Sequence, residues 1–210
     1  MSSTRRAKLN DAAVSGERVF LRHPSVRDLG ELITLNRAST RLHRGLASPP
    51  TRPEEFHAFL KRCRRIDCAC FLICRLEDDA IVGTVNLSQI FRGGFQNAYL
   101  GYYVGERYAG QGYMTEALRL MLRYAFLELK LHRLEANIQP DNVASIALVM
   151  RAGFVREGYS RRYLKICGRW RDHERWALIA EDWKRNSRLA EERGMVLRKR
   201  DSLSMKSAIE

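Results

Sequence analysis

Residues 104–115 read VGERYAGQGYMT, and this stretch decides the fold of the chain. It leads from the apolar stretch Asn97–Val104, through a loop with three glycines, into the amphipathic stretch Gly112–Leu129. Such a strand–loop–helix unit brings backbone N–H groups to a helix start, where the helix dipole adds partial positive charge. Glycine lets phosphate oxygens approach that backbone closely. We therefore expect residues 105–112 to bind an anion.

Three nucleotide-binding patterns overlap on this loop. Gly105-x4-Gly110 has the spacing of a P-loop, but Gln111-Gly112 stands where Lys and Ser or Thr are needed. Gly110-x-Gly112 begins a dinucleotide fingerprint, yet the third glycine is missing and the preceding strand lies in an antiparallel run. The third pattern, Arg107-x-x-Gly110-x-Gly112, is complete and matches the R/Q-x-x-G-x-G/A loop of acetyl-CoA-dependent N-acetyltransferases. A tight turn without a ligand is the alternative.

Apolar periodicity on both sides of the loop predicts a mixed α/β fold, with a mostly antiparallel sheet flanked by helices. Before the loop we expect strands at Glu17–Arg22, Cys70–Arg75, Ile81–Phe91 and Asn97–Val104, and helices at Ser25–Ala38 and Glu54–Arg65. The last three of these strands predict an antiparallel meander. After the loop we expect helix Gly112–Leu129, strand Arg133–Gln139, helix Asp141–Ala152 with Asp141 or Asn142 as N-cap, and a strand pair, Phe154–Ile166 and Trp170–Ala180.

A second segment, downstream of the loop, indicates a superfamily. Pro140–Ser145 (PDNVAS) and the later Gly153-Phe154 resemble the second cofactor segment of GNAT N-acetyltransferases. Residues 17–183 as a whole resemble a GNAT domain. Several stretches are similar to the Rim-type ribosomal-protein alanine N-acetyltransferases, and most to the form that acts on small-subunit protein S5: Ile81–Gly83 with Asn86, Tyr99–Tyr102, Glu157–Tyr159 and Gly168–His173.

This resemblance implies acetyl-CoA as cosubstrate. In the superfamily a bulge parts the strand before the loop from the next strand, and pantetheine lies in the gap. Here those strands correspond to Tyr102–Val104 and Glu135–Gln139, and the Val104 N–H would be the oxyanion donor. Backbone N–H groups from Arg107 to Met114 would bind the pyrophosphate, and Asn142 the pantetheine arm. The expected cofactor residues are Tyr102, Tyr103, Val104, Arg107, Ala109, Gly110, Gln111, Gly112, Tyr113, Met114 and Asn142.

The resemblance also implies a group that protonates the leaving thiolate. Many relatives use a Tyr four residues before the Gly-Phe pair, but Val149 occupies that position here. Rim-type relatives can place a Ser at the position of Ser145, and we expect Ser145 to take this role. The alternative is that Ser145 only satisfies an N–H group at the start of its helix.

The general base is the second catalytic role. Some relatives carry a Glu on the strand before the Asn segment, where this chain has Asn137, which cannot accept the proton. Glu135 lies on the same strand face by period two, so we expect it to act as the base. Glu135 can equally pair with an arginine, and the further candidates are Glu157, Asp172 and His173. An α-amine titrates near pH ~8, so a modest acceptor suffices.

Charge divides the chain into three parts. The 210 residues carry 37 Lys and Arg against 24 Asp and Glu, a net charge of +13. We expect an N-terminal segment at 1–16, a GNAT domain at 17–183 and a basic C-terminal helix or tail at 184–210. The end segments hold +2 and +4, and residues 156–175 of the last strand pair hold +4. This surplus favours contact with rRNA or the ribosome surface, with solvated tails and an ordinary charged strand pair as the alternatives.

Other features exclude a membrane protein and a metalloenzyme. No stretch of eighteen apolar residues is present, so a membrane span is not expected. Five cysteines without framework spacing favour a reducing, cytoplasmic location. Cys68, Cys70 and Cys74 are expected to be buried on one strand face, and the histidines lack ligand spacing, so we expect no metal.

We therefore expect an enzyme that transfers acetyl from acetyl-CoA to the N-terminal α-amine of a protein, a ribosomal protein with N-terminal alanine. One alternative is a GNAT enzyme for a small amine, such as a polyamine, which favours an acidic pocket. Another is an RNA-binding or ribosome-assembly factor that retains an acetyl-CoA site. The oligomeric state does not follow from the sequence.

Overall fold

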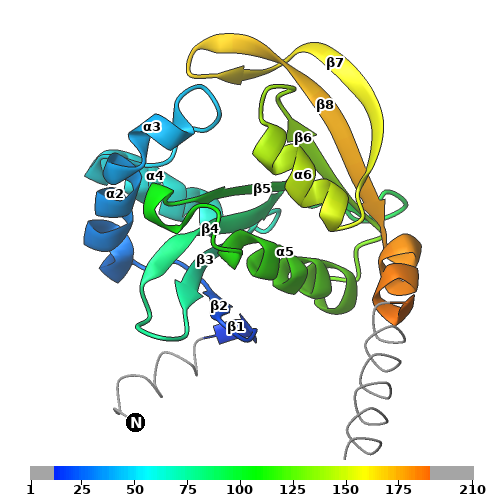
Figure 1. The fold of residues 1–210 in the computed structure, drawn as a ribbon, viewed down its shortest axis with the longest axis horizontal. Helices are drawn as coiled ribbons and strands as arrows, with labels where there is room; N and C mark the ends of the chain where they lie inside the picture. Colours follow the sequence, from blue (N-terminus) through cyan, green and yellow to red (C-terminus); the bar gives the residue numbers. More distant parts are fainter. Residues whose placement is uncertain (1–11, 190–210) are drawn as a thin grey trace, which may run out of the picture.

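Strands of residues 12–189, the part of the chain that the computed structural model describes, form one sheet (Figure 1). Its order is β1-β2-β3-β4-β5-β6-β8-β7, and neighbours are antiparallel except for β5 and β6. The mostly antiparallel mixed fold is thereby confirmed. The strands are β1 (Ala12–Ser15), β2 (Val19–Arg22), β3 (Ala69–Arg75), β4 (Ile81–Ser88), β5 (Asn97–Val104), β6 (Arg133–Ile138), β7 (Val155–Ile166) and β8 (Arg169–Ile179).

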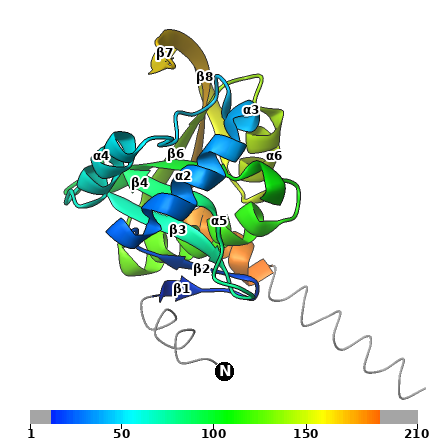
Figure 2. The same cartoon turned by 90° about the vertical axis from the view of Figure 1, so that its left-hand side faces the viewer.

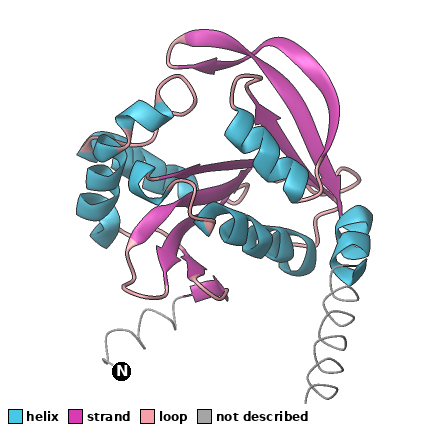
Figure 3. Cartoon of the chain, viewed as in Figure 1, coloured by secondary structure: helices cyan, strands magenta, loops and turns pink. Residues whose placement is uncertain are grey.

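Helices cover both faces of this sheet (Figure 3). Tyr103 of β5 contacts Asn36 of α2, while Tyr102 contacts Ser145 of α6. Since successive side chains of a strand point to opposite faces, α2 and α6 lie on opposite sides of the sheet. The helices are η1 (Val26–Asp28), α2 (Leu29–Ala38), α3 (Thr40–His43), α4 (Pro53–Cys63), η2 (Glu106–Tyr108), α5 (Tyr113–Arg123), η3 (Tyr124–Glu128), α6 (Val143–Arg151) and a helix at 180–189.

The predicted helix Gly112–Leu129 is divided into two parts. Its first part is the α-helix α5, and its second part is the π-helical segment η3. The apolar face expected from the sequence is buried, and Ala117, Leu118 and Met121 are at most 1% exposed. This face packs on the sheet beside fully buried Phe20 and Phe71.

The strand β1 corrects the expected N-terminal boundary. Ala12–Ser15 pairs antiparallel with β2, so the sheet begins inside the segment 1–16 that the sequence places outside the domain. At the other end, the expected C-terminal helix is described only as far as residue 189 and begins earlier, at residue 180. Residues 190–210 of the basic tail lie outside the described residues. Within residues 12–189, no helix is long and apolar enough to cross a bilayer.

The strands β5 and β6 are paired over a short distance only. Their parallel register covers Asn97↔Arg133, Ala98↔Leu134 and Tyr99↔Glu135, and stops there. Beyond Tyr99 the two strands part, as the sequence resemblance implies. The register between β4 and β5 is regular through Val104. The pairing of β5 with β4 therefore lacks the bulge that the resemblance implies.

The β7–β8 hairpin extends beyond the rest of the fold in two perpendicular views (Figures 1 and 2). Its turn is formed by Cys167 and Gly168, both at positive φ, as expected for this strand pair. Ser48, in the loop after α3, lies 3.4 Å from Cys167 (Oγ to Sγ). The hairpin tip and this loop therefore meet across the end of the β5–β6 gap.

Candidate active site

The start of α5 presents unpaired backbone N–H groups. Gly110 and Gly112 have φ values of 74° and 84°, which side chains with a β-carbon rarely adopt, and the chain enters α5 at Gly112. No side chain of the described residues caps this helix start. The N–H groups of Tyr113 and Met114 therefore have no intrahelical acceptor, and the helix dipole adds positive charge beside them. This geometry suits an anion, as predicted.

Contacts with Arg18 and with Val19, the first residue of β2, hold the helix start in place. Glu116 Oε1 accepts hydrogen bonds from the N–H groups of Arg18 (2.8 Å) and Val19 (3.2 Å). The Arg18 guanidinium donates to the Gln111 carbonyl at 3.0 Å and lies 4.3 Å from the centroid of the Tyr113 ring. These contacts fix the end of the loop without using the N–H groups that face outward.

The first half of the loop is closed by its own hydrogen bonds. The Ala109 N–H donates to the Glu106 carbonyl at 3.1 Å, so it is not available for a pyrophosphate, contrary to the expectation. Gln111 Nε2 donates to the Arg107 carbonyl at 2.7 Å, and the Arg107 guanidinium lies over the Tyr108 ring. Arg107 and Gln111 therefore shape the loop through their side chains.

The Val104 amide points into the gap between β5 and β6. Gly105 N–H donates to the Val82 carbonyl of β4 at 2.8 Å, and amides alternate sides along a strand. The Val104 N–H and carbonyl therefore face the opposite edge. His43 Nε2 donates to this carbonyl at 2.9 Å. His43, from α3, thus binds the carbonyl of the residue whose N–H is predicted to be the oxyanion donor.

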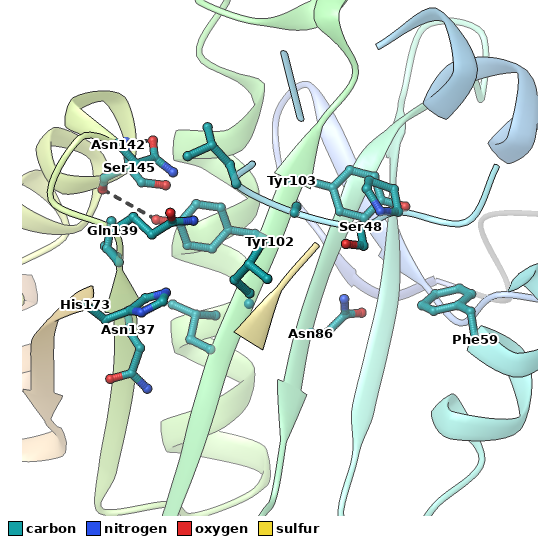
Figure 4. Close-up of a pocket in the computed structure, with 18 of the residues that line it drawn as sticks. Ser48, Phe59, Asn86, Tyr102, Tyr103, Asn137, Gln139, Asn142, Ser145 and His173 are labelled. Atoms are coloured by element: carbon teal, nitrogen blue, oxygen red, sulfur yellow. Dashed lines mark hydrogen bonds between the residues drawn. The ribbon is translucent and has the colours of Figure 1, made fainter. Parts of the chain in front are cut away.

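Two cavities meet at this gap. The larger, here called the loop cavity, measures about 470 Å³ and borders the start of α5. The smaller, the hairpin cavity, measures about 330 Å³ and borders β4, β6 and β8 (Figure 4). Predicted cofactor residues that line the loop cavity are Tyr102, Tyr103, Val104, Ala109, Gly110, Gly112, Met114 and Asn142; Arg107, Gln111 and Tyr113 do not line it. Both cavities share Leu46, Ala47, Tyr102, Tyr103, Asn142 and Ser145.

Three side chains occupy the junction of the cavities (Figure 4). Asn142, rather than Asp141, caps α6, because its Oδ1 accepts the Ser145 N–H at 3.2 Å. The Tyr102 hydroxyl donates to the Ser145 carbonyl at 3.5 Å, and burial raises the pKa of Tyr102 to about 12. The Ser145 side chain also interacts with the Tyr102 hydroxyl, and this interaction opposes the rise in the pKa of Tyr102. The N–H group of Ser145 is satisfied by Asn142.

Glu135 does not reach either cavity, which corrects its assignment as the base. It lies opposite Tyr99, at the last paired position before β5 and β6 part. Its carboxylate forms an ion pair with Arg133 at 2.9 Å and accepts from Asn97 Nδ2 at 3.2 Å. Asn137, one step further on the same face, does line the hairpin cavity. The pairing with an arginine is the correct interpretation of Glu135.

His173 is the base candidate that the structure brings to the hairpin cavity. It is 3% exposed, and its Nδ1 donates to the Arg171 carbonyl at 3.0 Å. In the neutral ring Nε2 is then the acceptor. The other two candidates are engaged elsewhere, since Glu157 pairs with Arg133 and Asp172 accepts from Tyr159 and the Arg162 N–H. Neither lines the cavity.

Several lining residues were not singled out as functional from the sequence. His43 reaches Val104 across 61 positions of the chain, and Gln139 donates to the Gly45 carbonyl at 2.8 Å. Asn86 entered only as part of the family resemblance. Phe59 and Arg62 of α4 complete the wall of the hairpin cavity. No local pattern could identify these residues, because their roles depend on long-range packing. Among the described residues, no cluster of His, Cys, Asp or Glu could hold a metal ion.

Comparison with known proteins decides the family. Residues 18–155 match a family model described as an acetyltransferase (GNAT) domain. The chain belongs to the GNAT acetyltransferase family. This confirms the superfamily predicted from the loop and the segment at Pro140–Ser145.

Similar proteins place the chain near the Rim-type members of GNAT. It is 43% identical to the [ribosomal protein uS5]-alanine N-acetyltransferase of Escherichia coli over 107 residues, which are 51% of this chain and 55% of that protein. The chain thus spans about half the length of this relative. RimJ of Mycobacterium smegmatis, in complex with CoA-disulfide, superposes with a TM-score of 0.71 at 28% identity, covering 78% of this chain and 82% of that one.

A GNAT enzyme for a small amine has the same fold. Spermidine N-acetyltransferase from Vibrio cholerae, in complex with CoA and spermine, superposes with a TM-score of 0.68. It is 21% identical and covers 79% of this chain and 97% of that chain. At this identity the likeness concerns the fold alone.

Proposed function

We propose that this protein acetylates the N-terminal α-amine of a protein, a ribosomal protein with N-terminal alanine. The observation that carries the proposal is the hairpin cavity. It places a buried His173 beside the junction with the loop cavity, and its lining contains no Asp or Glu. A neutral acceptor amine with a short side chain suits such a lining. The similarity to an alanine N-acetyltransferase supports the same substrate class.

The loop cavity suits acetyl-CoA, which supplies the acetyl group as a thioester. The uncapped start of α5 and the two glycines at positive φ present N–H groups to the pyrophosphate. Asn142 retains its Nδ2 amide for the pantetheine arm, because only its Oδ1 is used as the helix cap. The Val104 N–H faces the gap and can donate to a developing oxyanion. These assignments keep those members of the predicted cofactor set that line the loop cavity, except for the Ala109 amide, and leave Arg107 and Gln111 to shape the loop.

The proton path that we propose uses residues of both cavities. His173 Nε2 accepts a proton from the acceptor amine as the new C–N bond forms. Ser145 Oγ–H donates toward the sulfur that leaves when the C–S bond breaks. Tyr102, protonated at neutral pH, lies beside it as a second donor. This path replaces Glu135 with His173 and retains Ser145.

A polyamine is a poorer fit than a peptide N-terminus. Polycations are bound by carboxylates, and the lining of the hairpin cavity offers none, while Arg62 adds a positive charge. The exposed β7–β8 hairpin is positively charged as well. Our proposal includes contact of this hairpin with rRNA, and a cytoplasmic location, where ribosomes are found.

Mass spectrometry of ribosomal proteins tests the function. We expect one N-terminus to lose the mass of an acetyl group in cells that lack the protein, and to regain it with the wild-type gene but not with a His173→Gln variant. Unchanged ribosomal N-termini, together with acetylation of spermidine by the purified protein, would replace the proposal with the small-amine function.

A further inference from the structure

Two asparagines line the hairpin cavity. Asn86 comes from β4 and Asn137 from β6, on either side of β5 (Figure 4). The Oδ1 atom of each is buried, and neither has a hydrogen-bond partner among the described residues. Asn86 Nδ2 donates to Thr84 Oγ1 at 3.3 Å, which orients this amide. The cavity therefore holds two buried acceptors without donors, one of them oriented by Thr84.

The floor between the two asparagines is open. Gly101 of β5 lies opposite Asn86 in the register, and a β-carbon added there would meet no heavy atom within 4 Å. On the other side, β5 has already parted from β6. A ligand can thus lie along β5 with Asn86 on one flank and Asn137 on the other.

Buried carbonyl oxygens are almost always paired, because an unpaired one loses its hydrogen bond to water without replacement. Two such oxygens in one cavity indicate a ligand that brings two N–H donors. The end of a peptide has this character, with the α-amine and the first peptide N–H close together. A polyamine has no peptide group, and its charges would meet no carboxylate in this lining.

We propose that Asn86 and Asn137 form the binding site for the first residue of the acceptor peptide. Asn137 Oδ1 accepts from the α-amine, and Asn86 Oδ1 accepts from the first peptide N–H. This order follows from register: Asn137 pairs with Arg175, two residues from His173, so Asn137 and His173 share one face of the β6–β8 pair. The inference rests on the proposed function and adds the residues that select a peptide.

An ester analogue of the acceptor tests the role of Asn86. The probes are a hexapeptide with N-terminal alanine and the same peptide with an ester in place of its first peptide bond, which removes one N–H. For the wild-type protein we expect kcat/KM to fall about tenfold with the ester. Asn86→Leu should lose about tenfold with the normal peptide and nothing further with the ester. The exposed Asn186→Leu, outside both cavities, is the matched control and should behave as wild type.

A charge-introducing variant tests Asn137. Asn137→Asp places a carboxylate beside the amine, so we expect turnover of spermidine to rise at least tenfold relative to turnover of the peptide. Calorimetry with CoA, and thermal melting, report whether each variant folds and keeps its cofactor site.

The outcomes separate this inference from the proposed function. If the wild-type protein turns over the peptide, two results would overturn the inference alone. One is a further tenfold loss of kcat/KM for Asn86→Leu when the ester replaces the peptide. The other is an Asn137→Asp variant whose ratio of spermidine to peptide turnover equals that of the wild type. If the wild-type protein binds the peptide without acetylating it, and Asn86→Leu weakens this binding, the proposed function is overturned while the binding site is supported. Neither binding nor turnover of the peptide would overturn both.

Discussion

A single hydrogen bond fixes the ring of His173, the base that we propose. The Arg171 carbonyl holds Nδ1–H and leaves Nε2 as the acceptor toward the hairpin cavity. No Asp or Glu lines this cavity, so no carboxylate competes for the amine proton there. His173 is therefore buried, lines the hairpin cavity and has a free acceptor nitrogen. Glu135 lies outside the cavity and is paired with Arg133.

We expect His173→Gln to lower kcat for an N-terminal alanine peptide about 10²-fold or more, within the range of general-base catalysis. The glutamine keeps the size of the side chain but cannot take the proton. Steady-state kinetics with acetyl-CoA measure the effect, and KM for acetyl-CoA should stay unchanged. His132→Gln, at an exposed histidine that pairs with Glu181, is the control. Equal activity of both variants would contradict the assignment of the base.

The tyrosines of β5 predict weaker folding at high pH. Burial raises the pKa of Tyr102 and of Tyr103 to about 12, while in the unfolded chain a tyrosine ionises near pH ~10. Between these values the unfolded state binds fewer protons, so the free energy of unfolding falls as pH rises. Each tyrosine contributes about 2–3 kcal/mol to this fall.

Urea unfolding at pH 9, 10 and 11 checks this prediction. Tyr103→Phe removes one of the two groups, so its stability should decline less over this range than that of the wild type. Trp170→Phe, at an exposed side chain of the β7–β8 hairpin, removes no titrating group and is the control, which should decline as the wild type does. A parallel decline of Tyr103→Phe and wild type would show that Tyr103 does not titrate with folding.

Among the elements, α5 and its loop carry the proposed anion site through their backbone geometry. Gly112→Glu puts a β-carbon at a φ of 84° and a carboxylate against N–H groups that we assign to a pyrophosphate. We expect calorimetry to detect no binding of CoA. Gly93→Glu is a matched control, because Gly93 also has a positive φ (67°) and open surroundings but lies in the β4–β5 loop. Retained CoA binding in Gly112→Glu would sink the cofactor site.

Local signals predicted most elements, and long-range contacts decided the rest. The bounds of β5 agree with the sequence, because apolar residues and turns mark both of its ends. The strand β1 could not be predicted, since Ala12–Ser15 has no clear alternation and its pairing comes from β2. The parallel pairing of β5 with β6 also depends on tertiary structure. The loop of the site could be predicted because its glycines are a local signal. The contact of His43 with Val104 and the choice of Arg133 as partner of Glu135 depend on tertiary structure, so the sequence did not decide them.

At the scale of the whole molecule, positive charge and the hairpin cavity meet at the β7–β8 hairpin. Arg161, Arg162, Lys165 and Arg169 are exposed, and none of them forms an ion pair with a residue in the described part of the chain. Trp170, beside them, is 60% exposed. The same hairpin carries His173 into the cavity. A polyanion on this surface would thus bring an attached acceptor close to the site.

Replacing three of these cations should separate docking from chemistry. We expect the variant with Arg161→Gln, Lys165→Gln and Arg169→Gln to acetylate a free alanine peptide as the wild type does. Its KM for small ribosomal subunits should rise, and the slope of log KM against log salt should fall by about 3, since each phosphate contact contributes about one counterion. Kinetics from low to physiological salt measure both effects. An unchanged slope would mean that the hairpin does not touch RNA, and the positive charge would then serve solubility alone.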